Sequence, residues 1–179
     1  DGKPHSVNAA SDDPRASQIV ESGRFFQRRW QPGGAVGIPT DTTRSGLEIS
    51  AWPDYLSLVF RFSPTVDVRN GSIEMTMSLS GMQPKVLGDG QAVGIADREG
   101  KGFVLLPASG ATSIEMDREN RTIRVRSAMA DWQPGRNISV GMIILPASSG
   151  VEQAFKRERS ETMKPTQVEA SAVEPAISR

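Results

Sequence analysis

Carboxylates are the residues of this sequence whose number and placement would allow acid–base chemistry. Glu74 and Glu115 each lie in a segment where polar and apolar residues alternate, so both are expected on the exposed face of a strand. A glycosidase uses two such carboxylates on either side of the sugar bond that it breaks. A sheet that brings Glu74 and Glu115 together therefore leaves a carboxylate-based glycosidase open, beside the simpler interpretation of two solvated glutamates.

Other catalytic chemistries are restricted by two residue counts. The chain has no cysteine, which excludes disulfides, thiolate nucleophiles and zinc–thiolate sites. Its single histidine, His5, lies in a polar N-terminal segment, away from the strand-forming residues that would position a Ser-His-Asp triad. We therefore expect a protein that is not an enzyme and that needs no cofactor.

Calcium is the inorganic ligand that the sequence leaves open. Asp89, Asp97 and Glu99 flank one predicted hairpin that is rich in glycine. Calcium prefers clustered oxygen ligands from loops of this kind. Acidic residues are also common in turns because they bond to nearby backbone amides.

Aromatic residues supply a second kind of candidate site. Trp52 and Tyr55 stand three positions apart at a predicted strand junction, Trp52-Pro53-Asp54-Tyr55, where a ring can be exposed. Exposed rings pack against the C–H faces of sugars. Trp30 and Trp132 are further candidates, and each of these rings can instead anchor a turn or the edge of the core.

Two arginine clusters supply a third kind of candidate site. Arg24, Arg28 and Arg29 are close in sequence, and Arg124 and Arg126 share one face of a predicted strand. Guanidinium groups pair with carboxylates and sulfates, so both clusters are candidate contacts for an acidic protein partner or a glycan. A solvated face is the alternative.

Overall charge and hydropathy limit the partners. The chain has 21 Lys+Arg and 21 Asp+Glu, and this neutrality argues against nucleic-acid binding. No apolar run reaches the roughly 18 residues that a membrane-spanning helix needs. The sequence begins at Asp1 without methionine and has a polar, Ser/Asn/Asp-rich start, from which we expect export to a periplasmic or secreted location.

The elements that must position these residues are strands. Apolar residues recur at every second position in three long segments, so each segment has one buried and one exposed face: 55–62, 72–79 and 137–144. Shorter segments fit the same period: Gly46–Ala51, Ala92–Ala96, Phe103–Leu106, Ser113–Met116 and Thr122–Arg126.

Turn-forming residues separate these strands, without helical segments between them. Asn70-Gly71, Gly88-Asp89-Gly90 and Pro134-Gly135 are examples. About nine short strands at near-even spacing predict an all-β, antiparallel β-sandwich. We expect an irregular N-terminal arm over 1–22, the sandwich over 23–150, and a polar tail over 151–179 with a short helix at Val151–Arg159.

A stretch of the predicted sandwich also resembles a known group. It runs from Asn70 to Leu106, about a fifth of the chain, and its key segments are Asn70–Met75, Gly88–Ile95 and Gly102–Leu105. These segments resemble concanavalin A-like jelly rolls of the laminin-G and lectin type. The resemblance implies a jelly-roll sandwich and a sugar site at the position of Asp89, assisted by calcium.

Two functions follow from these features. The first is a non-enzymatic accessory subunit or interaction module, which docks onto a larger extracytoplasmic assembly through its arms and arginine clusters. The alternative is a carbohydrate-binding, lectin-like module that uses Trp52, Tyr55 and Asp89, as part of a larger glycan-active enzyme or alone.

Overall fold

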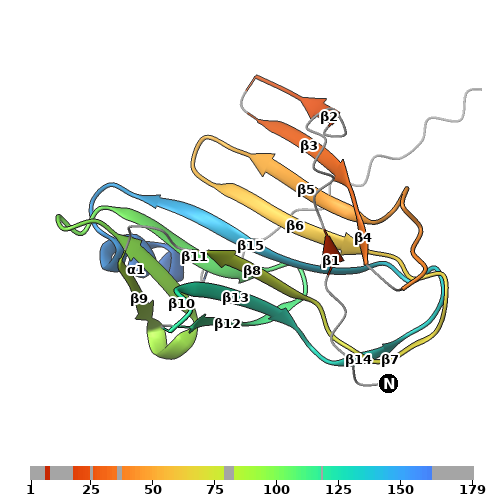
Figure 1. Cartoon of the computed structure of the whole chain (residues 1–179). Helices are drawn as coiled ribbons and strands as arrows, with labels where there is room; N and C mark the ends of the chain where they lie inside the picture. Colours follow the sequence, from red (N-terminus) through yellow and green to blue (C-terminus); the bar gives the residue numbers. More distant parts are fainter. Residues whose placement is uncertain are drawn as a thin grey trace, which may run out of the picture.

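The computed structural model shows an antiparallel β-sandwich with one helix (Figure 1). It describes residues 7–8, 18–24, 26–35, 38–78, 83–117 and 119–162. The strands are β1 (Val7–Asn8), β2 (Gln18–Ser22), β3 (Gln27–Pro32), β4 (Gly34–Ala35), β5 (Gly46–Ala51), β6 (Leu56–Phe62), β7 (Val68–Gly71), β8 (Glu74–Ser78), β9 (Gln83–Leu87), β10 (Ala92–Ala96), β11 (Gly102–Ala108), β12 (Ala111–Asp117), β13 (Thr122–Ser127), β14 (Ala130–Trp132) and β15 (Ile138–Ala147). A 3₁₀ turn, η2 (Gly88–Gly90), follows β9, and α1 (Val151–Thr162) follows β15.

One layer is an eight-stranded sheet with the order β2-β3-β5-β6-β15-β11-β10-β9. Every neighbouring pair in this main sheet is antiparallel. Its longest strand, β15, lies in the middle and pairs with β6 on one side and β11 on the other. The sheet therefore joins the early strands of the chain to the later ones through β15.

The second layer is the three-stranded sheet β12-β13-β8, which packs mainly against β10, β11 and β15. The part of the main sheet made by β2, β3 and β5 extends beyond this layer (Figure 1). We call this part the wing. A two-stranded sheet, β14-β7, lies at the other end of the β5 and β6 strands from their connecting turn.

The core lies between the two layers and follows the predicted alternation. Val140 of β15 pairs with Phe60 of β6, and Val125 of β13 pairs with Met75 of β8, so inward side chains meet across the strands. The buried members of the core are Phe60, Phe62, Ile73, Val93, Ile95, Leu105, Ile114, Ile123, Val125, Trp132, Val140 and Met142. These positions confirm the antiparallel sandwich that the sequence predicts.

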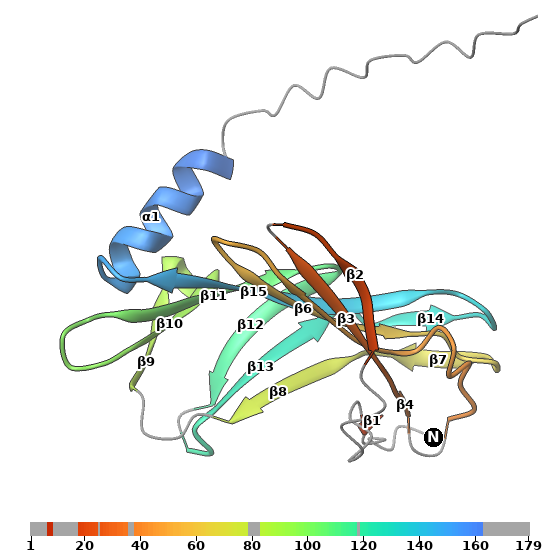
Figure 2. The same cartoon turned by 90° about the horizontal axis from the view of Figure 1, so that it is seen from above.

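Helix α1 covers the opposite, outer face of the main sheet at its β9–β11 end (Figure 2). It begins directly after Gly150, where the sequence predicts a short helix, and continues to Thr162. Val151 and Phe155, one helical turn apart, are buried against Leu87, Ala92 and Val104. Of the described elements, none is a helix long and apolar enough to cross a membrane.

The structure adds strands where the sequence shows no alternation. β2 extends the sheet into the segment predicted as an irregular arm, and β3 contains part of the first arginine cluster. Both strands lie in the wing, beyond the three-stranded layer that buries the inner face of the rest of the main sheet. A strand in such a position needs no apolar face, which explains why the periodicity does not reveal it.

Candidate functional site

Three aromatic rings form a row at one end of the wing. Trp52 and Tyr55 flank the turn between β5 and β6, and the Trp52 amide donates a hydrogen bond of 2.9 Å to the Tyr55 carbonyl. Phe26 directly precedes β3. The ring centroids of Phe26 and Trp52 are 4.7 Å apart and those of Trp52 and Tyr55 are 5.9 Å apart, with interplanar angles of 15° and 25°. We call these residues the aromatic row.

Strand pairing explains why the rings meet. Gln27 of β3 pairs with Ala51 of β5, and Ala51 pairs with Leu56 of β6. The residues next to these, Phe26, Trp52 and Tyr55, therefore lie in one line across the three adjacent strands. Adjacent strands are about 4.7–4.9 Å apart, which is close to the ring spacing. Because side chains alternate between faces, the row lies on the outer face, the face that carries α1. Trp52, in the middle, keeps 39% of its surface exposed.

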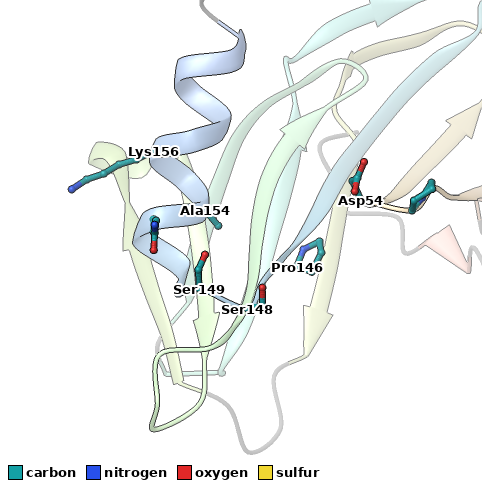
Figure 3. Close-up of a pocket in the computed structure, with 8 residues that line it drawn as sticks. Asp54, Pro146, Ser148, Ser149, Ala154 and Lys156 are labelled. Atoms are coloured by element: carbon teal, nitrogen blue, oxygen red, sulfur yellow. The ribbon is translucent and has the colours of Figure 1, made fainter.

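A hollow of about 590 Å³ lies between the β5–β6 turn and the start of α1 (Figure 3). Pro53 and Asp54, the two residues between Trp52 and Tyr55, form one wall. The rest of the lining comes from the end of β15, its connection to α1, and α1 itself: Pro146, Ser148, Ser149, Gln153, Ala154 and Lys156. The hollow thus adjoins the aromatic row and is lined mostly by polar groups.

A ladder of ion pairs crosses the outer face beside the row. Arg28 of β3 lies 3.2 Å from Glu21 of β2 and 3.8 Å from Glu48 of β5. Glu48 also accepts hydrogen bonds of 3.1 and 3.0 Å from the Nε and Nη2 atoms of Arg61 in β6. These four residues, which we call the wing ladder, alternate in charge across four adjacent strands.

The structure therefore brings together three of the residues proposed from the sequence: Arg28, Trp52 and Tyr55 are on one face. Arg29 follows Arg28 in a strand and lies on the opposite face, where its Nε atom donates a hydrogen bond of 3.1 Å to Gln27. Arg24 precedes the row in the chain and has an interaction of its own. Whether these arginines contact a partner stays a prediction.

Arg124 and Arg126 lie in the other layer, on the outer face of β13, and are engaged within the sheet. Arg124 pairs with Asp117 of β12, and Arg126 pairs with Glu74 of β8. The hydrogen bond to Glu74 raises the pKa of Arg126. Hydrogen bonds from Asn120 are the main cause that lowers the pKa of Asp117, and the charge of Arg124 adds to it. Their predicted role as docking contacts would require a partner that competes with these carboxylates.

The two glutamates considered for glycosidase chemistry take part in the same ion pairs. Glu74 and Glu115 lie on β8 and β12, on either side of β13, and the Arg126 guanidinium is within 4 Å of both carboxylates. It occupies the space in which a sugar bond and a water molecule would have to lie. The geometry is that of an ion-pair ladder.

The hairpin considered for calcium shows local bonding. The Asp97 carboxylate accepts the backbone N–H groups of Glu99 and Lys101 at 2.8 and 3.0 Å, and Glu99 pairs with Lys101 at 2.9 Å. Asp89 lies in η2, and its side chain is outside the described residues. In the described ranges, no group of three or more acidic or histidine side chains is arranged to hold a metal ion.

Sequence reasoning missed Phe26 and the residues that α1 contributes. Phe26 follows Phe25 in an arginine-rich segment without alternation, so nothing local predicts that it joins a surface row of rings. Gln153 and Lys156 belong to a polar helix, and only the packing of α1 onto the main sheet brings them opposite Asp54.

Comparison with known proteins gives a fold relation. No family model and no curated protein matches the chain. A mutant of the heparan sulfate lyase HepC from Pedobacter heparinus superposes with a TM-score of 0.50 and 11% identity, over 74% of this chain and 22% of that one. A protein assigned as a kojibiose phosphorylase, from the human microbiome, superposes with a TM-score of 0.45 and 8% identity, over 76% of this chain and 20% of that one. We draw nothing from this second superposition.

This chain thus spans about a fifth of the length of these solved structures. At such identity the likeness to the lyase establishes a shared fold only. The concanavalin A-like assignment stays a prediction, since no family model supports it. The likeness to the lyase is consistent with the β-sandwich that the structure shows.

Proposed function

We propose that this domain binds carbohydrate without acting on it chemically, and that the aromatic row is the contact surface. The observation that carries the proposal is the stacking of Phe26, Trp52 and Tyr55 on an outer sheet face, with Trp52 39% exposed. Exposed aromatic groups beside polar groups are typical of sugar sites, because sugars present both C–H faces and hydroxyls.

The order of the rings indicates how a sugar would be held. Trp52 comes from the middle strand, so Phe26 and Tyr55 flank it, and its exposed part is an edge. A glycan would lie across the exposed edge of Trp52, with the half-buried rings of Phe26 and Tyr55 on either side.

The fold relation supports this proposal at a coarse level. The structure that superposes with a TM-score of 0.50 belongs to a heparan sulfate lyase, and the domain matches about a fifth of it. A binding domain of this kind fits a role within or beside a larger glycan-active protein. The polar, Ser/Asn/Asp-rich N-terminal segment of this chain favours an extracytoplasmic location, which is part of the same proposal.

The test is a glycan panel followed by calorimetry on the wild type and two variants. Trp52→Ala should abolish binding of every glycan that the wild type retains, because it removes the central ring. Met129→Ala is the control: Met129 is 69% exposed, and it lies in the β13–β14 connection outside the row. Unchanged affinity in Trp52→Ala, with the fold intact by circular dichroism, would refute the assignment.

A second function, docking of a protein partner, is favoured by the outer edge of the wing. β2 is the terminal strand of the main sheet, and its Ile19 and Val20 are 54% and 52% exposed. Terminal strands of this kind pair with strands of other proteins. Native purification with cross-linking tests it: a stoichiometric partner lost in Val20→Lys supports docking, and a lone monomer refutes it.

A further inference from the structure

We infer that the glycan is an uncharged oligosaccharide, and that the hollow beside α1 is a second subsite for it. This inference rests on the proposed binding at the aromatic row. It adds the chemical class of the ligand, its minimum length and the residues that hold its far end.

The first observation is continuity between the row and the hollow. Trp52, Pro53, Asp54 and Tyr55 form a single turn, with the flanking residues in the row and the central two in the wall of the hollow. A ligand that lies along the rings toward Tyr55 therefore reaches Asp54 without leaving the protein surface. Helix α1 stands on the other side of the hollow and limits how far the ligand extends (Figure 3).

The second observation is the mixture of donors and acceptors that line the hollow. Asp54 offers acceptors, Lys156 offers donors, and Gln153 offers both. The hydroxyls of Ser148 and Ser149 also do both. A sugar hydroxyl is likewise a donor and an acceptor, so each ligand hydroxyl finds a complementary group. An apolar ligand would leave these polar groups without partners, which is unfavourable.

The third observation is the balance of charge around the site. In the wing ladder, Arg28 and Arg61 are paired with two glutamates. On α1, Glu152 pairs with Lys85 of β9. Inside the hollow, Asp54 and Lys156 are of opposite sign. A sulfated or uronic glycan would have to compete with these glutamates for Arg28, Arg61 and Lys85 and would meet the like charge of Asp54, whereas a neutral glycan leaves the ion pairs intact.

The experiment measures Kd by calorimetry for neutral di- and tetrasaccharides (gluco-, xylo- and manno-oligosaccharides) and for heparan sulfate and polygalacturonate fragments. We expect a neutral tetrasaccharide to bind about tenfold or more tightly than its disaccharide, since only the longer ligand reaches the hollow. Its Kd should change by less than about twofold between roughly 50 and 500 mM NaCl, because no ion pair forms. Preference for the acidic fragments, with affinity that falls in salt, would overturn the inference.

Variants test the hollow itself. Asp54→Asn combined with Gln153→Ala should weaken tetrasaccharide binding about tenfold or more and leave the disaccharide unchanged. Asp67→Asn is the matched control, since Asp67 is an exposed aspartate before β7, at the other end of the sheet. Equal loss for both ligands, or loss for neither, would show that the hollow is no subsite.

The outcomes separate this inference from the proposed function. Suppose that Trp52→Ala abolishes binding, but that the protein prefers acidic glycans or that the hollow variants have no effect. That result supports the aromatic row as the binding site and refutes only the inference about the hollow and the uncharged ligand. No binding by any glycan of the panel, or binding that survives Trp52→Ala, refutes both.

Discussion

Replacing Phe155 with alanine should release α1 from the main sheet while leaving the sandwich folded. Phe155 is only 8% exposed and is, with Val151, the apolar anchor of the helix against Leu87, Ala92 and Val104. Its ring also lies directly over Gly88, where an added Cβ would collide with it. The helix therefore depends on a small cluster that is separate from the main core.

The magnitude follows from this burial. Burying a phenylalanine side chain contributes about 1.5–3 kcal/mol, and truncation in a full core costs about 3–5 kcal/mol. Phe155 lies at a surface junction, so we take about 2–3 kcal/mol. Since each 1.4 kcal/mol is a factor of ten, the population of the released state should rise by roughly 30- to 150-fold. A released helix of 12 residues is marginal in water, so it should also unfold.

Hydrogen–deuterium exchange with peptide resolution measures this directly. Amides of α1 should lose protection by that factor in Phe155→Ala, while those of β6 and β15 keep theirs. Gln153→Ala, an exposed change in the same helix, is the control and should leave exchange unchanged. Unchanged protection of α1, or an equal loss in β15, would show that the helix is not held by this contact.

Three further outcomes are expected. The hydrogen bond from Lys85 lowers the pKa of the Glu152 carboxylate, so this ion pair stabilises the fold above the ordinary pKa of glutamate and the stabilisation is lost as the pH falls through the lowered pKa of the folded state. Acid should therefore loosen α1 in exchange experiments, and Glu152→Gln should remove this pH dependence. Arg126→Ala should lower the free energy of unfolding by less than about 1 kcal/mol in urea titrations, because its ion pairs are largely exposed. Gly71→Ala should cost about 1–3 kcal/mol in the same titrations, because its Cβ would lie 2.6 Å from the buried Trp132 ring.

The strands that the sequence predicts are those with one buried face. In β6 and β15 the apolar residues alternate, and Phe60 and Val140 meet in the core. β9 and β3 escape detection for a physical reason, since β9 is an edge strand with Pro84 and β3 carries ion pairs on its outer face. Alternation reports burial, and strands at the margins of a sheet have little of it.

The candidate site shows the same division. Trp52 and Tyr55 could be identified because a short turn separates them, and local sequence is enough to predict a turn. Phe26 joins them only because β3 pairs with β5 in a particular register, which no local pattern encodes. Arg28 and Arg29 are neighbours in sequence and lie on opposite faces, so a cluster of charges in a strand does not predict a charged surface.

The position of the wing explains why its outer face needs both ions and rings. The second layer packs mainly against β10, β11 and β15, so the wing is held by strand pairing to β6 and by its own side chains. Each pair of the wing ladder contributes at most about 1 kcal/mol at the surface, but together they cover four strands with polar groups. The aromatic row lies at the end of this face. Its exposure beside a polar hollow is better explained by a ligand, and exchange experiments should show the β5–β6 turn gaining protection when the neutral tetrasaccharide is added.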